Sequence, residues 1–125
     1  MTLYDHVDLR VSDLAKVRAL YDVLLPAMGF SRVVEDGPNI NYYVAVDDRS
    51  QPFFGLMTDP GHARNGTRIA FRAASRAEVD RFAEIARAAG AGAFEAPENY
   101  DGSPRYYAAF FEDADGNKLE ICFRE

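Results

Sequence analysis

The sequence contains two strand–helix segments, "DHVDLRVSDLAKVRALYDVLLPAMG" (5–29) and "TRIAFRAASRAEVDRFAEIARAAG" (67–90). In each, alternating apolar residues predict a half-buried strand, and apolar residues at three- and four-residue steps then predict an amphipathic helix. The segments align at an offset of 62 residues, so that His6 corresponds to Arg68 and Arg10 to Arg72. Two long copies do not make a solenoid, so we interpret the chain as a duplicated module.

Local signals set the limits of the remaining elements. Ser12 or Asp13 is expected to cap the first helix and Gly29 to end it. Ser75 and Glu78 have the spacing of a capping box at the start of the second helix. Further strands are expected at about 30–35, 40–47, 52–57 and 92–96, and in a hairpin over 105–123 that turns at "DADGN".

Length, charge and cysteine content narrow the class of protein. A chain of 125 residues corresponds to one domain with a core of its own. The net charge of −6 argues against nucleic acid or an anionic membrane as a partner. The single Cys122 excludes an internal disulfide and a cysteine-rich zinc site. With no apolar run of about 18 residues and no signal-peptide pattern, we expect no membrane span and a cytoplasmic location.

The two segments, together with the hairpin "YYAAFFEDADGNKLEICF" (106–123), resemble the vicinal oxygen chelate superfamily. This superfamily includes glyoxalase I, extradiol dioxygenases, fosfomycin-resistance enzymes and bleomycin-binding proteins. The resemblance implies an α+β fold class, in which two βαβββ modules form a curved incomplete barrel, the glyoxalase/bleomycin resistance/dihydroxybiphenyl dioxygenase fold. It implies one domain over 1–125, with modules at about 1–58 and 67–125 and a linker at about 59–66. A small-molecule ligand in the cup of the barrel and a homodimer are expected with it.

The resemblance places the metal-ligand positions of the family at His6, Gly55, Arg68 and Glu120. His6 and Glu120 can ligate a metal, but a guanidinium has no lone pair and keeps its charge. Within about 5 Å, Arg68 would repel a divalent ion by several kcal/mol at an effective dielectric near 20. We therefore favour a metal-free protein in which Arg68 pairs with the Glu120 carboxylate. The alternative is a Zn, Ni, Mn or Fe ion held by His6 and Glu120, with His62 of the linker as a substitute ligand.

Strand alternation predicts which side chains face the ligand. His6 and Glu120 are the candidate catalytic residues, although each also fits a purely structural role. Cys122 is expected on the same face as Glu120, as a buried thiol without a lowered pKa. Arginines among aromatic residues favour a small organic molecule with an anionic group. The candidate ligand-binding residues are Asp8, Arg10, Arg68, Arg72, Tyr106 and Tyr107.

Three functions remain open at this point. The first is a metal-dependent lyase, isomerase or dioxygenase, with Glu120 as ligand and base. The second is a metal-free binding protein, similar to the drug-sequestering resistance proteins. The third is metal-independent catalysis, with His6 as general base and Arg68 stabilising an oxyanion.

Overall fold

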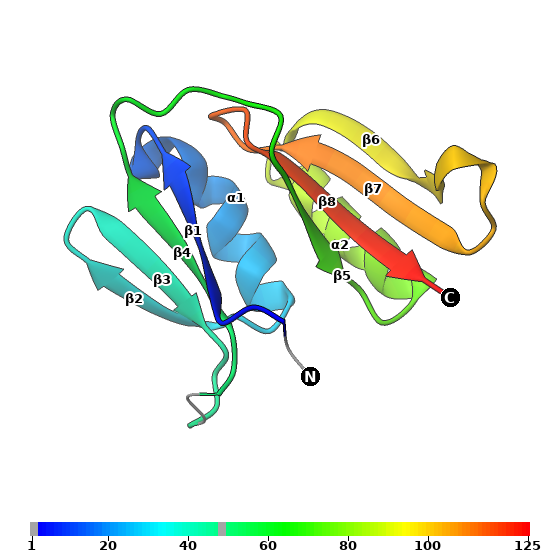
Figure 1. Ribbon diagram of the computed structural model, residues 1–125, viewed down its shortest axis with the longest axis horizontal. Coiled ribbons are helices and arrows are strands. Elements are labelled where there is room, and N and C mark those ends of the chain that lie inside the picture. Colours follow the sequence, from blue (N-terminus) through cyan, green and yellow to red (C-terminus); the bar gives the residue numbers. More distant parts are fainter. Residues whose placement is uncertain (1–2, 48–49) are drawn as a thin grey trace. The chain divides into compact units, whose positions relative to one another are not determined.

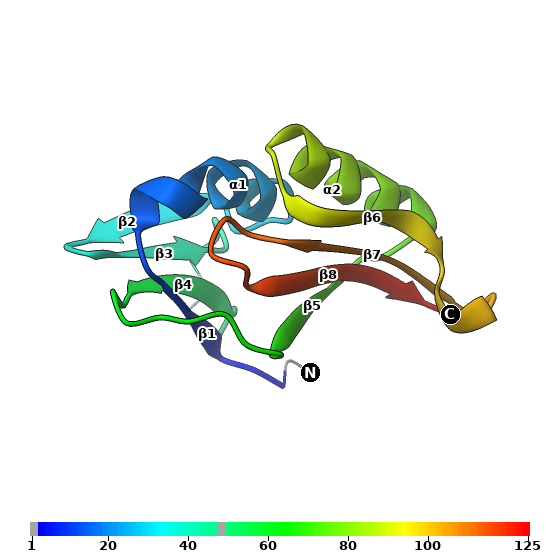
Figure 2. The same cartoon turned by 90° about the horizontal axis from the view of Figure 1, so that it is seen from above.

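A computed structural model of the protein describes residues 3–47 and 50–125. The chain divides into two compact units, Met1–Ala63 and Arg64–Glu125, and the division falls inside the predicted linker. Within the described residues, each unit has one α-helix and one four-stranded sheet in the order βαβββ (Figures 1 and 2). The predicted α+β class and the two βαβββ modules are thereby confirmed. In the described parts, no helix is long and apolar enough to cross a membrane.

The sheet of unit 1 has the strand order β1-β4-β3-β2. Strands β1 and β4 are parallel, and the other pairs are antiparallel. Strand β3 ends earlier than the predicted position 47. Its last residue, Tyr43, pairs with Phe53 of β4. The residue that precedes Phe53 is Pro52, which has no N–H with which to continue the ladder. The elements are β1 (His6–Val11), α1 (Leu14–Ala27), β2 (Arg32–Asp36), β3 (Asn39–Tyr43) and β4 (Phe53–Thr58).

Helix α1 packs on one face of this sheet (Figure 2). Its N-cap is Asp13, whose side chain accepts a hydrogen bond from the Ala15 N–H at 3.0 Å, which decides between the two predicted caps. The ring of Tyr21 lies 6.1 Å from that of Phe54 on β4. The buried stripe of the helix, at three- and four-residue spacing, consists of Val17, Leu20, Tyr21, Leu24 and Leu25.

Unit 2 repeats this topology, with the strand order β5-β8-β7-β6. Ser75 caps α2 by accepting a hydrogen bond from the Glu78 N–H, while the Glu78 carboxylate accepts one from the Ala74 N–H. The strand predicted at 92–96 is longer, and irregular register shifts separate it into segments against β7. The elements are β5 (Arg68–Arg72), α2 (Arg76–Ala88), β6 (Gly92–Asn99), the short 3-10 helix η1 (Tyr100–Gly102), β7 (Tyr106–Glu112) and β8 (Lys118–Arg124).

Each sheet has a helix face and a polar face. Along β1, Val7, Leu9 and Val11 are more buried than the residues between them, and β5 shows the same alternation. The side chains of a strand alternate between faces, so the charged residues of β1 and β5 lie opposite the helices. The candidate site residues must therefore be sought on these two polar faces.

Candidate functional site

A row of stacked side chains crosses the polar face of unit 1. His6 on β1 stacks on Phe53 of β4, with ring centroids 4.5 Å apart and planes 8° from parallel. Phe53 contacts Tyr43 of β3 at 4.9 Å between centroids. The Arg32 guanidinium of β2 lies 4.4 Å from the centre of the Tyr43 ring. The strand register places these four side chains opposite one another, so the row joins all four strands.

The neighbouring row on the same face is centred on Gly55. Asp8 and Asn41 are its register partners on either side. A Cβ at Gly55 would lie 2.8 Å from the Asp8 Oδ1 and 2.8 Å from the Asn41 Oδ1, so glycine leaves the space that these oxygens use. The Asn41 Oδ1 is buried without a hydrogen-bond partner among the described residues. A ligand donor can satisfy the Asn41 Oδ1, or rotation of the Asn41 amide can turn its NH₂ group toward Asp8 in place of that oxygen.

His6 lies between two carboxylates. Its Nδ1 is 2.7 Å from the Asp5 Oδ2, and its Nε2 is 3.6 Å from the Asp8 Oδ2. The hydrogen bond to Asp5, partly offset by desolvation and reinforced by the charges of Asp8 and Asp5, raises the pKa of His6 above its usual 6.5. Imidazolium is thus favoured, and a proton on either ring nitrogen competes with a metal for its lone pair.

We expect Asp5→Asn to lower the pKa of His6, because the largest stabilising contact of the imidazolium loses its charge. The pKa is measured from the ring Cε1–H resonance in an NMR titration. Because the pKa of His6 is raised in the folded state, protonated His6 stabilises the fold below about pH 6.5. This stabilisation is lost as the pH rises through the folded-state pKa. Asp101→Asn is the matched control, since Asp101 adopts a left-handed conformation that asparagine also tolerates. An unchanged His6 titration in Asp5→Asn would contradict the assigned cause.

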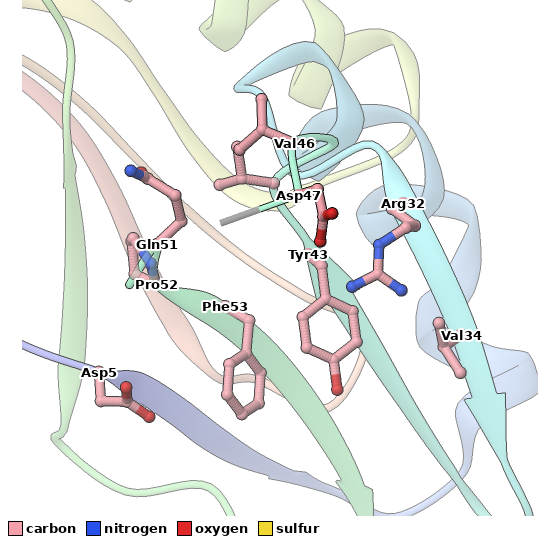
Figure 3. A pocket seen from close by; sticks show the side chains of 10 residues that line it. Asp5, Arg32, Val34, Tyr43, Val46, Asp47, Gln51, Pro52 and Phe53 are labelled. Atoms are coloured by element: carbon pink, nitrogen blue, oxygen red, sulfur yellow. The ribbon is translucent and has the colours of Figure 1, made fainter. Parts of the chain in front are cut away.

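A cavity of about 670 Å³ opens on the polar face of unit 1. Figure 3 shows Phe53 and Tyr43 side by side, with the Arg32 guanidinium beside Tyr43 and Asp5 on the far side of Phe53. The size lies within the range of small-molecule pockets, and the mixture of aromatic and charged groups is typical of them. The lining residues are Asp5, Arg32, Val34, Tyr43, Val44, Val46, Asp47, Gln51, Pro52 and Phe53.

In unit 2, Glu120 is a buried carboxylate at 5% exposure on β8. The Tyr106 O–H of β7 donates a hydrogen bond to its Oε2. Burial and this hydrogen bond raise the pKa of Tyr106, so the phenol stays a neutral donor. Burial, the Glu120 charge and a hydrogen bond to that carboxylate also raise the pKa of Cys122, in agreement with the expected unreactive thiol. Glu120 is therefore satisfied by protein donors.

The predicted pair between Arg68 and Glu120 does not form. Across the parallel β5–β8 ladder, Arg68 is opposite Lys118, whereas Glu120 is opposite Ala70. The Arg68 guanidinium instead lies 5.0 Å from the centre of the Phe110 ring on β7. The register therefore places Arg68 and Glu120 two residues apart along the ladder, which the sequence pattern does not encode, and Glu120 accepts from Tyr106 instead.

Arginines gather on this polar face. Arg72 is opposite Cys122 in the register, and the Arg124 guanidinium lies 3.8 Å from the centre of the Tyr106 ring. Across the described ranges 3–47 and 50–125, neither forms an ion pair, and the same is true of Arg68. An arginine stacked on a ring keeps its N–H edge available for a carboxylate or phosphate. The face can therefore hold an anion.

Tyr107 requires a correction. Tyr106 and Tyr107 are consecutive on β7 and point to opposite faces. The Tyr107 O–H donates to the Asp80 Oδ1 of α2 at 2.6 Å, and the Arg76 guanidinium lies over its ring. Tyr107 therefore belongs to the helix face, so only Tyr106 shares the polar face with Glu120.

The residues at the predicted metal-ligand positions are divided between the two units. Among the described residues, no three His, Cys, Asp or Glu side chains are grouped to hold a metal. His6 belongs to unit 1 and is hydrogen bonded to Asp5, while Glu120 belongs to unit 2 and accepts from Tyr106. The Nε2 of His62 is buried and has no hydrogen-bond partner in the part of the chain that the structure describes. Arg68 and Gly55 supply no ligand at all.

Two functional candidates were missed in the sequence. Arg124 follows Glu120 and Cys122 at two-residue steps, so strand alternation could have placed it on their face. Arg32 had no such signal, because every residue of β2 is exposed and its strand shows no apolar alternation.

Arg10, a predicted ligand-binding residue, lies on the polar face of unit 1, opposite Met57 of β4.

Comparisons with known proteins identify relatives of this arrangement. The family model of the Glyoxalase/Bleomycin resistance protein/Dioxygenase superfamily matches residues 3–121. A glyoxalase/bleomycin resistance protein from Albidiferax ferrireducens T118 is similar in structure, with a TM-score of 0.80 and 28% identity over 99% of this chain and 100% of that one.

More distant structures share the fold. The fosfomycin resistance protein FosX from Listeria monocytogenes has a TM-score of 0.73 and 19% identity, covering 100% of this chain and 95% of that one. A glyoxalase-related enzyme from Fulvimarina pelagi has a TM-score of 0.71 and 18% identity, covering 99% of this chain and 89% of that one. A search of curated proteins found no significant match.

Proposed function

Since the chain belongs to the Glyoxalase/Bleomycin resistance protein/Dioxygenase superfamily, we propose that it binds a small organic anion without a resident divalent metal ion. The observation that carries this proposal is the group of arginines on the polar face of unit 2. Arg68, Arg72 and Arg124 project from the two parallel strands β5 and β8 without carboxylate partners among the described residues. A guanidinium retains its charge at any working pH, so this face attracts anions whatever the pH.

Aromatic rings on the same face support an organic ligand. Tyr100 of η1 lies 5.2 Å from Tyr106 and 5.0 Å from Phe110, measured between ring centroids. Tyr100 is 45% exposed, so the edge of this cluster is accessible. Rings beside arginines offer an apolar surface and a charge to one molecule, which is what a ligand with a ring or chain and an acidic group requires.

The hydrogen bonding of Glu120 supports metal-free binding. Tyr106 already uses one acceptor site of Glu120, and a metal ion beside this carboxylate would experience the positive field of Arg68 on the adjacent strand. Replacement of a metal by guanidinium groups keeps the site cationic, so it can still hold oxygen-rich molecules. The proposed activity is accordingly binding or sequestration.

Metal content tests the first part of the proposal. Mass spectrometry of untagged protein after incubation with Ni, Zn, Mn and Fe(II) is expected to find well below one ion per chain. Arg68→His removes the repelling charge and adds a donor, so metal affinity should rise, whereas Arg68→Lys, which keeps the charge, should show no gain. Near-stoichiometric metal in the native protein, lost in Glu120→Ala, would contradict metal-free binding.

Inorganic phosphate is the probe for the anion. In an NMR titration, the Nε–H resonances of Arg68, Arg72 and Arg124 are expected to shift together. Arg81 is the internal control, because its guanidinium also lies over a ring, 4.5 Å from the centre of Phe82, but on helix α2. Equal shifts at Arg81 would indicate nonspecific screening and would remove the support for an anion site.

A second candidate function is metal-independent proton transfer by His6. The specific observation is the contact between the His6 Nδ1 and the Asp5 carboxylate, which orients the ring and supports the imidazolium. A positioned carboxylate–imidazole pair is a recurrent arrangement for a general base. Turnover that is lost in His6→Ala, with folding intact, would distinguish it from binding alone.

A further inference from the structure

The described lining of the unit 1 cavity combines aromatic rings with the cationic Arg32. Phe53 and Tyr43 lie side by side in its wall, and the stacked row continues to His6 on one side and to Arg32 on the other (Figure 3). The rings come from paired positions of two central strands, so their spacing is set by the ladder. Both residues line the cavity, so an aromatic ligand can pack against their rings.

Arg32 supplies the charge at one end of this surface. Its guanidinium carbon lies over the Tyr43 ring, 4.4 Å from the ring centre, and a guanidinium in contact with a ring still has N–H groups for an anion. In the described parts of the chain, Arg32 forms no ion pair and no hydrogen bond with a carboxylate. An edge of parallel N–H groups matches the two oxygens of a carboxylate, which lies in the plane of the ring that carries it.

The carboxylates among the described lining residues, Asp5 and Asp47, restrict the ligand further. The Asp5 Oδ2 is 2.7 Å from the His6 Nδ1, so this carboxylate already has a partner within the protein. Asp47 is exposed and stands with Arg32 in the same lining. Among the described lining residues, a carboxylate near the arginine disfavours a ligand with two negative charges, because the second charge would be repelled. An aromatic ring with a single carboxylate suits both the aromatic lining and the charge of Arg32.

We propose that the cavity of unit 1 binds a planar aromatic monocarboxylate, with its ring on Phe53 and Tyr43 and its carboxylate on Arg32. This inference rests on the proposed binding of a small organic anion, and it adds the chemical class of the ligand and its anchor. It assigns a binding role to Arg32, Tyr43 and Phe53.

The probes are 2-naphthoate, the neutral 2-naphthamide and the dianionic 2-naphthyl phosphate. Binding is measured on the full chain by calorimetry, and the site is located by amide NMR shifts. Arg32→Gln is expected to weaken 2-naphthoate about 10- to 100-fold, the usual size of a hydrogen bond to a charged group. Arg81→Gln, which removes a ring-stacked arginine from helix α2, should leave the affinity unchanged. The amide and the phosphate should each bind at least about 10-fold more weakly than 2-naphthoate.

Ring stacking is tested separately from charge. Tyr43→Phe keeps the ring and should retain binding, while Tyr43→Leu should weaken 2-naphthoate about 10-fold, the upper part of the range for aromatic pairs. Shifts centred on Phe53 and Tyr43 together with the loss in Arg32→Gln would support the inference. Equal binding of the acid and the amide, or tighter binding of the phosphate, would overturn it.

Arg68→Gln separates this inference from the proposed function. If 2-naphthoate binding is lost in Arg68→Gln and kept in Arg32→Gln, with shifts only on the polar face of unit 2, the cavity assignment is overturned while anion binding by the protein stands. If none of the probes binds and phosphate shifts none of the unit 2 arginines, both ideas are overturned. Loss in Arg32→Gln alone, with circular dichroism unchanged, supports the cavity as the carboxylate site.

Discussion

Replacing Tyr106 with phenylalanine is expected to lower the free energy of unfolding by about 1–3 kcal/mol, the usual cost of leaving a buried polar group without its partner. Glu120 is 5% exposed, and the Tyr106 O–H donates a hydrogen bond to its Oε2 from the neighbouring strand. Phenylalanine fills nearly the same volume, so the loss reports the hydrogen bond and not a cavity. Urea unfolding followed by circular dichroism measures the change.

Tyr107→Phe is the matched control for this measurement. It removes the same hydroxyl from the adjacent residue of β7, but from a hydrogen bond with Asp80 that is exposed to solvent. Water can replace an exposed partner, so we expect a loss of about 0.5 kcal/mol or less. Equal losses in the two variants would mean that Glu120 does not depend on Tyr106, and the argument that protein donors satisfy this carboxylate would fail.

The second large effect is expected for Leu24→Ala, which should destabilise the protein by about 2–5 kcal/mol. Leu24 is fully buried on the stripe of α1 that faces the sheet of unit 1. Truncation removes apolar contacts and leaves a cavity that the sheet cannot fill, because β1, β4 and β3 are held by their ladder. Thermal and urea unfolding both measure the loss.

Val23→Ala provides the comparison on the same helix. Val23 is 47% exposed, and alanine has the higher helix propensity, so this change should stay within about 0.5 kcal/mol and can be stabilising. A small loss at Leu24, or equal losses at both positions, would show that α1 does not stabilise unit 1 through this stripe. Contacts other than those of α1 would then have to hold the strands that carry the row of stacked side chains on the opposite face.

Much of the architecture could be read before the structure. The apolar spacing of α1 and α2 predicted both helices, and alternation in β1 and β5 predicted which residues face away from them. These patterns are local, so a window of a few residues contains them. Strand ends were less predictable. Strand β3 stops at Tyr43 because its partner strand begins after Pro52, and that reason lies nine residues further along the chain.

For the candidate site, too, some features were predictable from the sequence and others depended on the tertiary structure. The sequence by itself determined that position 68 carries a permanent charge and that position 55 has no side chain, because residue identity alone decides what can ligate a metal. Only the tertiary structure decided that Glu120 bonds to Tyr106 and that Arg32 stacks on Tyr43. Those contacts depend on the register between strands distant in sequence, and a shift of one residue would reverse the face of every side chain.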